Sequence, residues 1–203
     1  ALGANRALLG QEIIQFAHAA PLGGGQWRLS GLWRGRGGTE SALAGHAAGE
    51  PFLLLDGTGT MLDPAVVGTV PGTRIAAIGM GDGAPVSSTI ALAGIGLRPL
   101  SPVHGKANLL AGGDLAIDWV RRARGGWRWD DGIDTPINEQ SEIYHVAFGP
   151  PSAPLATWTT TSPALVIPAA TLTELTALAP SGPLSIRQLG DHGQSDALVL
   201  TLP

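Results

Sequence analysis

Residues 114–122, DLAIDWVRR, carry the clearest structural pattern in the second half of the chain. Leu115, Ile117 and Trp119 occupy every second position in it, separated by other residues. Alternation of this kind is typical of a strand that buries one face. The segment therefore predicts a strand whose inner face, including Trp119, contacts Tyr144 or its neighbours on another strand.

The same pattern recurs through the rest of the second half. Tyr144, Val146 and Phe148 alternate, as do the leucines of residues 198–202. The predicted strands cover residues 105–111, 114–122, 141–149, 154–161, 163–169, 183–189 and 196–202. Seven short strands separated by turn residues indicate an antiparallel sandwich. Residues 171–179 fit either a helical turn or an irregular connection.

A proline-bracketed join, Arg98-Pro99-Leu100-Ser101-Pro102, precedes this series. Proline restricts its own backbone and that of the residue before it, so the join is extended. We therefore expect two small β domains, residues 1–98 and 99–203, in an all-β chain.

The first domain is predicted to be rich in strands and interrupted by glycine. Trp27, Leu29, Gly31 and Trp33 alternate and predict a half-buried strand. A turn at residues 23–25, all glycine, joins it to the preceding strand. The predicted strands are 11–20, 26–34, 51–56, 73–80 and 89–97, with a short helix capped by Thr39 and running through Ala44.

Composition excludes several classes of protein. The net charge is −4 and charged residues make up only 14% of 203, which argues against a nucleic-acid-binding chain. No apolar run is long enough for a membrane span. The absence of cysteine removes disulfides and thiol chemistry. The chain begins without Met, and we expect that it was cut from a longer polypeptide.

The sequence contains no strong catalytic motif, so no catalytic residue, cofactor or metal ligand is predicted. The histidines are scattered and lack the spacing of a metalloprotease helix. His46 and Glu50 are four residues apart, but Gly49 and Pro51 break the helix that would align them. We therefore expect no acid–base pair there, and we predict that the chain is not an enzyme.

A group of tryptophans and carboxylates follows the strand that contains Trp119 and forms the candidate contact surface. The tryptophans of this group either pack in a core or stack on a partner protein or a sugar. The carboxylates either are solvated or hold calcium, although their spacing differs from that of an EF-hand. The candidate partner- or glycan-contact residues are Trp127, Trp129, Asp130, Asp131 and Asp134.

Three arginines stand at 121, 122 and 124, where we expect them to alternate along a strand. Two interpretations remain open for them. They form bidentate pairs with carboxylates such as Asp118 or Glu142, or they stand at a solvated strand edge.

Two stretches resemble a known family. The first is GQEIIQF at residues 10–16, followed by WRLSGLWRGRGGTE at 27–40 and HAAGEPFLLLD at 46–56. It resembles the C-terminal region of the large tail-tip, or baseplate hub, proteins of gene transfer agents and related siphophage-like prophages. One departure is Trp33, where that family usually has leucine.

The second stretch starts with RPLSPVH at residues 98–104 and continues with DWVRRAR at 118–124. Trp129, Glu139 and Tyr144 follow it. It is similar to the downstream module of the same family, which implies a fibronectin type III-like sandwich, or more broadly an immunoglobulin-like one, for the second domain.

The resemblance implies a phage tail protein, a virion component made in the bacterial cytoplasm. Its partners would be other tail-tip or baseplate proteins in an oligomeric particle, with host attachment through a surface polysaccharide or receptor. The isolated chain would be a monomer. An alternative class is a carbohydrate-binding or glycoside-hydrolase accessory module that uses Trp127, Trp129 and the acidic loop. A glycan array with Trp129→Ala separates the two.

Overall fold

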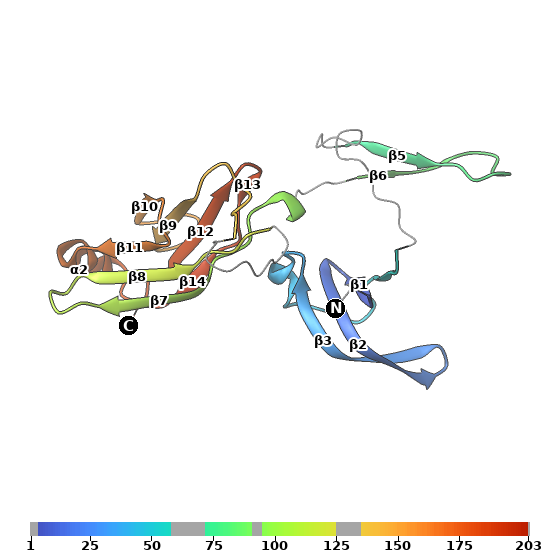
Figure 1. Ribbon diagram of the computed structural model, residues 1–203, viewed down its shortest axis with the longest axis horizontal. Coiled ribbons are helices and arrows are strands. Elements are labelled where there is room, and N and C mark those ends of the chain that lie inside the picture. The colour runs from blue at the N-terminus through green and yellow to red at the C-terminus, as the bar shows by residue number, and fades with distance from the viewer. Residues whose placement is uncertain (1–3, 58–71, 91–94, 125–134, 203) are drawn as a thin grey trace. The chain divides into compact units, whose positions relative to one another are not determined.

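The computed structural model describes residues 4–57, 72–90, 95–124 and 135–202 (Figure 1). It divides into two compact units, Ala1–Gly96 and Leu97–Pro203. The second unit therefore starts close to the proline join. The described strands pair antiparallel, which confirms the prediction of an all-β chain.

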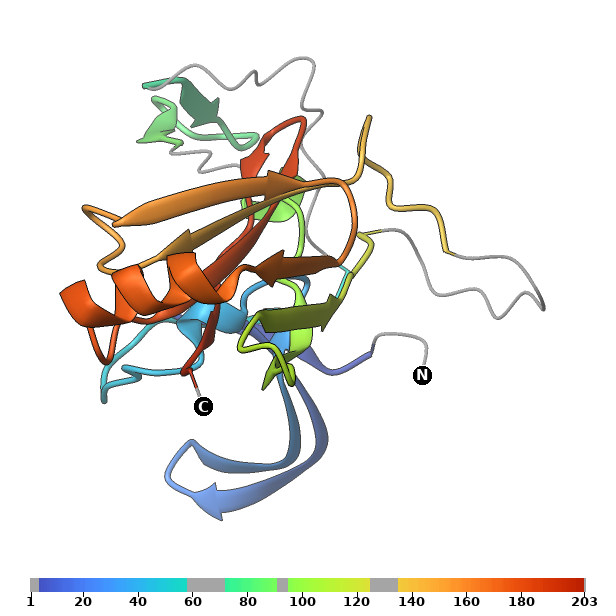
Figure 2. The same ribbon diagram turned by 90° about the vertical axis from the view of Figure 1, so that its left-hand side faces the viewer.

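The second unit consists of two sheets, which Figure 2 shows as separate layers. One sheet has the order β11 (Ala164–Ile167), β8 (Leu115–Val120) and β7 (Val103–Leu109). The other has the order β10 (Ala156–Thr160), β9 (Ile143–Phe148) and β12 (Leu184–Gly190), with β13 (Gly193–Gln194) and β14 (Leu198–Leu200) both paired to β12. Each of the seven predicted strands is present, and α2 (Ala169–Leu178) is a helix.

The order of these strands defines the kind of sandwich. In an immunoglobulin constant-type domain the fourth strand pairs in the sheet of the first, second and fifth. Here the fourth strand, β10, pairs with β9, and the helix α2 connects β11 to β12. The second unit is therefore a fibronectin type III-like β-sandwich, as expected.

The core of the sandwich lies between the two sheets. Leu115, Ile117 and Trp119 of β8 are buried, as predicted, and face buried side chains of β9 and β12. The ring of Trp119 meets that of Tyr144 edge to face, with centroids 5.1 Å apart and planes at 74°. Aromatic pairs prefer this geometry because the positive edge of one ring meets the negative face of the other.

The first unit contains one sheet of four strands and a separate hairpin. The sheet has the order β3 (Gln26–Arg36), β2 (Glu12–Gly23), β1 (Arg6–Leu9) and β4 (Phe52–Leu55). The hairpin is β5 (Arg74–Ala77) and β6 (Val86–Thr89). The sequence patterns did not reveal β1, whose four residues are too few to show a period.

Two local predictions in this unit are wrong. The strand predicted at 89–97 ends at Thr89, and a 3-10 turn covers Ile95–Leu97, while residues 91–94 lie outside the described part. The helix predicted through Ala44 is a single 3-10 turn, Glu40–Ala42. It has no side-chain cap because the hydroxyl of Thr39 bonds elsewhere.

The far part of the β2–β3 hairpin, residues 17–33, extends beyond the sheet, and we call it the arm. Its turn uses positive φ at the three glycines of 23–25, as predicted. The half-buried face predicted for residues 26–34 is wrong, since Trp27 is 60% and Trp33 is 55% exposed. Beyond Gln15, β2 pairs only with β3 among the described strands, so the arm is a two-stranded ribbon that projects past β1 and β4.

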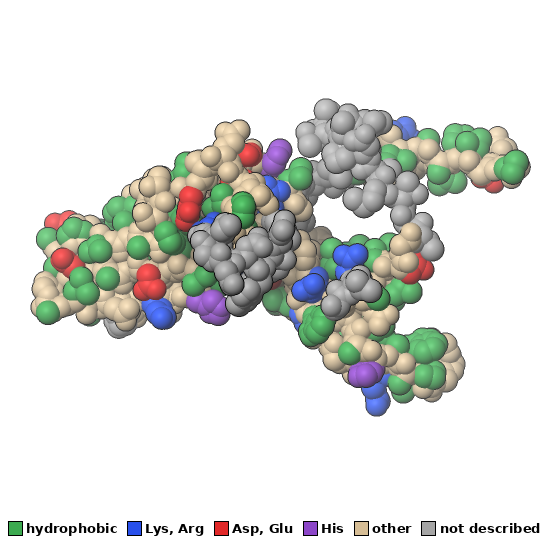
Figure 3. Space-filling view, in the orientation of Figure 1, with side chains coloured by type: hydrophobic (Ala, Val, Ile, Leu, Met, Phe, Trp, Pro, Cys, Tyr) green, Lys and Arg blue, Asp and Glu red, His purple; other side chains and the backbone are tan. Residues whose placement is uncertain are grey.

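The interior of the first unit is small and mostly polar. Its buried apolar side chains, among the described residues, are Ala7 and Ile14. Its buried polar ones are Glu12, Gln15 and Thr39. Hydrogen bonds and ion pairs therefore contribute much of the stability of this unit. Exposed apolar side chains gather at the tip of the arm (Figure 3).

Candidate functional site

A buried carboxylate stands at the start of β2. Glu12 has no exposed surface. Arg34 donates to both of its oxygens, with Nε 2.7 Å from Oε1 and Nη2 2.6 Å from Oε2. The backbone N–H of Gly35 adds a third donor at 2.6 Å. Such bidentate, charge-assisted bonds are among the stronger contacts that proteins make.

His46 joins this carboxylate to a second one. Its Nε2 lies 2.7 Å from Oε2 of Glu12, and its Nδ1 lies 2.7 Å from Oε2 of Glu50. The backbone N–H of Ala47 donates to the other oxygen of Glu50 at 2.9 Å. The expectation that His46 and Glu50 are not aligned for lack of a helix is wrong, because an irregular loop brings them into contact. We call Glu12, Arg34, His46 and Glu50 the Glu12 cluster.

These contacts shift the pKa values of the cluster. The hydrogen bond from Arg34 holds the pKa of Glu12 at about 2, against the opposing effect of burial. The bond with Glu50, and then that with Glu12, raises the pKa of His46 above 6.5. The bond with His46 lowers the pKa of Glu50 below 4.5. The cluster therefore keeps its carboxylates ionised and favours the imidazolium form of His46.

This arrangement suits structure better than catalysis. A general base needs a free nitrogen or oxygen within reach of a substrate proton. Both ring nitrogens of His46 are already bonded to carboxylates, and Glu12 is enclosed by its donors. The cluster fixes the loop of residues 46–50 against the start of β2.

Glycine is required at two positions around the cluster. A Cβ on Gly10 would lie 3.0 Å from Oε2 of Glu50. Gly35 has a φ of +60°, and a Cβ there would lie 3.2 Å from the Cα of Glu40. Nearby, the hydroxyl of Thr39 accepts from the N–H of Ile13 at 3.0 Å and donates to the carbonyl of Arg36 at 2.8 Å.

Sequence patterns did not identify the Glu12 cluster as a site. All four residues lie within the first stretch that resembles the tail-tip family, which was the available signal. Their spacing carries no motif because they come from a strand start, a strand end and a loop.

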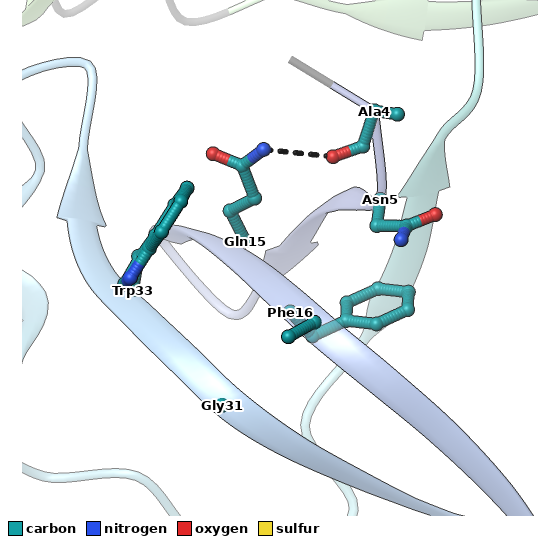
Figure 4. A pocket seen from close by; sticks show the side chains of 7 residues that line it. Ala4, Asn5, Gln15, Phe16, Gly31 and Trp33 are labelled. Carbon is teal, nitrogen blue, oxygen red and sulfur yellow. Dashed lines mark hydrogen bonds between the residues drawn. The ribbon is translucent and has the colours of Figure 1, made fainter. Parts of the chain in front are cut away.

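A pocket of about 240 Å³ lies on the sheet where the arm begins (Figure 4). Gly31 and Ala17 line it without long side chains. Trp33 and Phe16 supply aromatic rings. Gln15, with Ala4 and Asn5, completes the lining. The Nε2 of Gln15 donates to the carbonyl of Ala4 at 2.9 Å, whereas its buried Oε1 has no hydrogen-bond partner in the described chain.

The contact residues predicted from the sequence, Trp127, Trp129, Asp130, Asp131 and Asp134, lie outside the described residues. The arginines before them do not alternate along a strand as expected, because β8 ends at Val120. Arg124 pairs with buried Glu139, with Nε and Nη2 each 2.9 Å from Oε1. Arg121 donates to the carbonyl of Thr135 at 2.8 Å.

Neither a metal site nor a membrane helix is found in the part of the chain that the structure describes. No three His, Cys, Asp or Glu side chains there are grouped to hold a metal ion. No helix among those residues has the length and hydropathy to cross a membrane.

The fold thus defines an all-β protein whose second unit is a fibronectin type III-like sandwich. A family model described as Rcc01698-like, C-terminal, matches residues 1–53, the part that contains the Glu12 cluster. No curated protein matches the chain. A solved structure of the rat CD45 extracellular region, domains d3–d4, is similar over 91% of this chain and 92% of that one, at 11% identity and a TM-score of 0.36.

Proposed function

We propose that this chain is a non-enzymatic structural module of a phage-like or gene-transfer-agent tail tip, with a part in attachment to the host surface. The observation that carries the proposal is the small interior of the first unit. Only two apolar side chains are buried there among the described residues, Ala7 and Ile14. A module whose apolar surface is covered by neighbouring subunits needs little core of its own.

Exposed apolar residues on that unit support this proposal. Phe52, Leu53 and Leu54 of the edge strand β4 are 50%, 58% and 45% exposed. The arm adds Trp27 and Trp33. Exposed large apolar side chains that gather in patches usually mark an interaction site.

The chemistry of the Glu12 cluster supports the non-enzymatic part of the proposal. Its charged groups form hydrogen bonds and ion pairs with one another. Attachment to the host would involve the segment that contains Trp127 and Trp129, whose aromatic side chains suit a sugar or a protein surface.

The test is to locate the chain in particles. Antibodies against the purified protein are applied to phage-like particles induced from the source bacterium and viewed by immunogold electron microscopy. We expect gold at one end of the tail, and none on particles from a strain that lacks the coding sequence. Absence of the label from intact and gently disrupted particles, with the protein present in the cell extract, would contradict the assignment.

A further inference from the structure

The outer edge of the arm is open. β3 is the last strand of its sheet, so the N–H and C=O groups on its outer side pair with no strand of the described chain. Proteins usually protect such an edge with proline, charged side chains or a covering segment. Residues 26–34 contain no proline and, between Arg28 and Arg34, no charged residue, and they are almost entirely exposed. This edge has the properties of a docking strand.

The pocket beside this edge needs a particular kind of occupant. The buried Oε1 of Gln15 accepts hydrogen bonds and has none within the described chain. A buried polar group without a hydrogen-bond partner destabilises the protein, and a donor from outside would remove that destabilisation. The lining otherwise offers the aromatic rings of Phe16 and Trp33 (Figure 4). The occupant is therefore a flat apolar group that carries one N–H or O–H.

We infer that the occupant is Trp27 of a second copy of this chain. Two β3 strands that pair antiparallel about a two-fold axis at Ser30 place Trp27 of each copy opposite Trp33 of the other. Residues directly opposite in an antiparallel pair share a face. Trp27 also shares a face with Trp33 within one strand, because their positions differ by an even number.

This register brings the indole to the pocket. Trp33 lies opposite Gln15 in the β2–β3 ladder. Strands lie about 4.8 Å apart, so the backbone of Trp27 in the second copy stands about 10 Å from that of Gln15, a gap that their two long side chains span. The indole N–H donates and does not accept, which matches the free acceptor of Gln15.

Charge favours the same register. Pairing about Ser30 places Arg28 opposite Leu32 and Arg34 opposite Gln26, so no like charges face each other. Moving the axis to Gly31 would set Arg28 opposite Arg34, and like charges directly opposite destabilise a pair. A two-fold contact buries the same patch on both copies and closes on itself.

A cysteine at the axis tests the pairing directly, because the chain has none of its own. Opposed residues in an antiparallel pair have Cα atoms about 4.5–5.5 Å apart, within the range that a disulfide spans. Ser30→Cys should give a covalent dimer on mild oxidation. Ser88→Cys, exposed on β6, is the matched control and should give no covalent dimer under the same oxidation. Failure of Ser30→Cys to cross-link while the wild type sediments as a dimer would overturn this interface.

A pair of charge-introducing substitutions tests the register of the two β3 strands. Sedimentation velocity of the wild-type chain should show a dimer whose dissociation constant rises about tenfold or more in Trp27→Ala, as at other aromatic anchors. Leu32→Arg should weaken the dimer, because it faces Arg28 of the other copy. Arg28→Glu together with Leu32→Arg should restore it. A wild-type monomer at concentrations on the order of 100 µM, or a double variant as weak as the single one, would overturn the inference. The tail-tip proposal does not depend on this pairing and is tested separately by the labelling of particles.

Discussion

Gly31 lies so close to Ala17 across the arm that a Cβ on Gly31 would stand 2.7 Å from the Cβ of Ala17. Gly31 also has a φ of +64°. We expect Gly31→Ala to destabilise the hairpin by about 2–3 kcal/mol, since both the overlap and the left-handed backbone oppose a side chain.

Gly24→Ala is the matched control for that substitution. Gly24 has a φ of +59°, but a Cβ on Gly24 would meet nothing within 4 Å among the described residues. It should cost about 1–2 kcal/mol from the left-handed backbone alone. Hydrogen exchange of the arm measures both variants. Equal losses would mean that contact with Ala17 contributes nothing.

Trp119→Ala should remove much of the stability of the second unit. Trp119 is 4% exposed and packs edge to face on Tyr144, so its truncation leaves a cavity and costs about 3–5 kcal/mol. Trp119→Phe should cost clearly less, because it keeps an aromatic ring and removes a buried Nε1–H that has no hydrogen-bond partner in the described chain. Urea denaturation compares the two. Similar losses would contradict the role assigned to the ring.

Glu12→Gln should destabilise the first unit by about 2–3 kcal/mol. It removes a carboxylate that accepts from Arg34, Gly35 and His46, and Arg34 is 36% exposed, so water can compensate part of the loss. Glu50→Gln, at a side chain that is 23% exposed, should cost less. Hydrogen exchange resolved by peptide measures the effect, and peptides of 143–190 serve as the internal reference. The reverse order of the two variants would count against Glu12 as the centre of the cluster.

The free energy of unfolding of the first unit should be greatest in a middle range of pH and should fall at both lower and higher pH. The pKa of Glu12 is lowered from 4.5 to about 2, so its contribution is complete above pH 4.5 and is lost as pH falls toward 2. The pKa of His46 is raised from 6.5, so its contribution is complete below pH 6.5 and is lost as pH rises through the raised value. Stability should therefore be greatest between about pH 4.5 and 6.5.

The alkaline side of that window can be tested with one variant. Hydrogen exchange of residues 12–50, corrected for the intrinsic pH dependence, should show a less stable unit at pH 8.5 than at pH 5.5 in the wild type. His46→Gln should remove most of that difference, since glutamine does not titrate. A decline that persists in the variant would place its origin in another group.

The sandwich was largely predictable because apolar residues alternate regularly with other residues along its strands. Leu115, Ile117 and Trp119 alternate with outward residues, and the opposite sheet repeats the pattern at Tyr144 and Val146. Period-two alternation identifies a strand that buries one face whatever its partners are. The same rule placed Trp119 against Tyr144 or its neighbours on another strand, and the structure shows the contact with Tyr144.

The arm shows where the same rule fails. Trp27 and Trp33 alternate as well as any core strand, yet both are exposed. Alternation reveals that one face is apolar, not whether the same chain covers it. The tertiary arrangement decides that question, and here the arm projects past β1, whose four residues, Arg6–Leu9, carry too short a pattern to be found.

The Glu12 cluster was hidden for a different reason. Glu12, Arg34 and His46 come from separate elements, and only the tertiary fold brings their charges together. Reasoning from local helix geometry even argued against contact between His46 and Glu50. An irregular loop has no fixed period, so sequence spacing does not reveal which of its side chains meet.

The same cluster has a consequence for a protein that contains no cysteine. Its contacts join residues that are 22 positions apart, between Glu12 and Arg34, and 34 apart, between Glu12 and His46. Together they close two nested loops of chain, which is the work that a disulfide does in many small domains of modest core. Unlike a disulfide, this fastening needs no oxidising environment and re-forms spontaneously after each opening. It can therefore tie the first unit together equally well in a reducing cell interior and outside the cell.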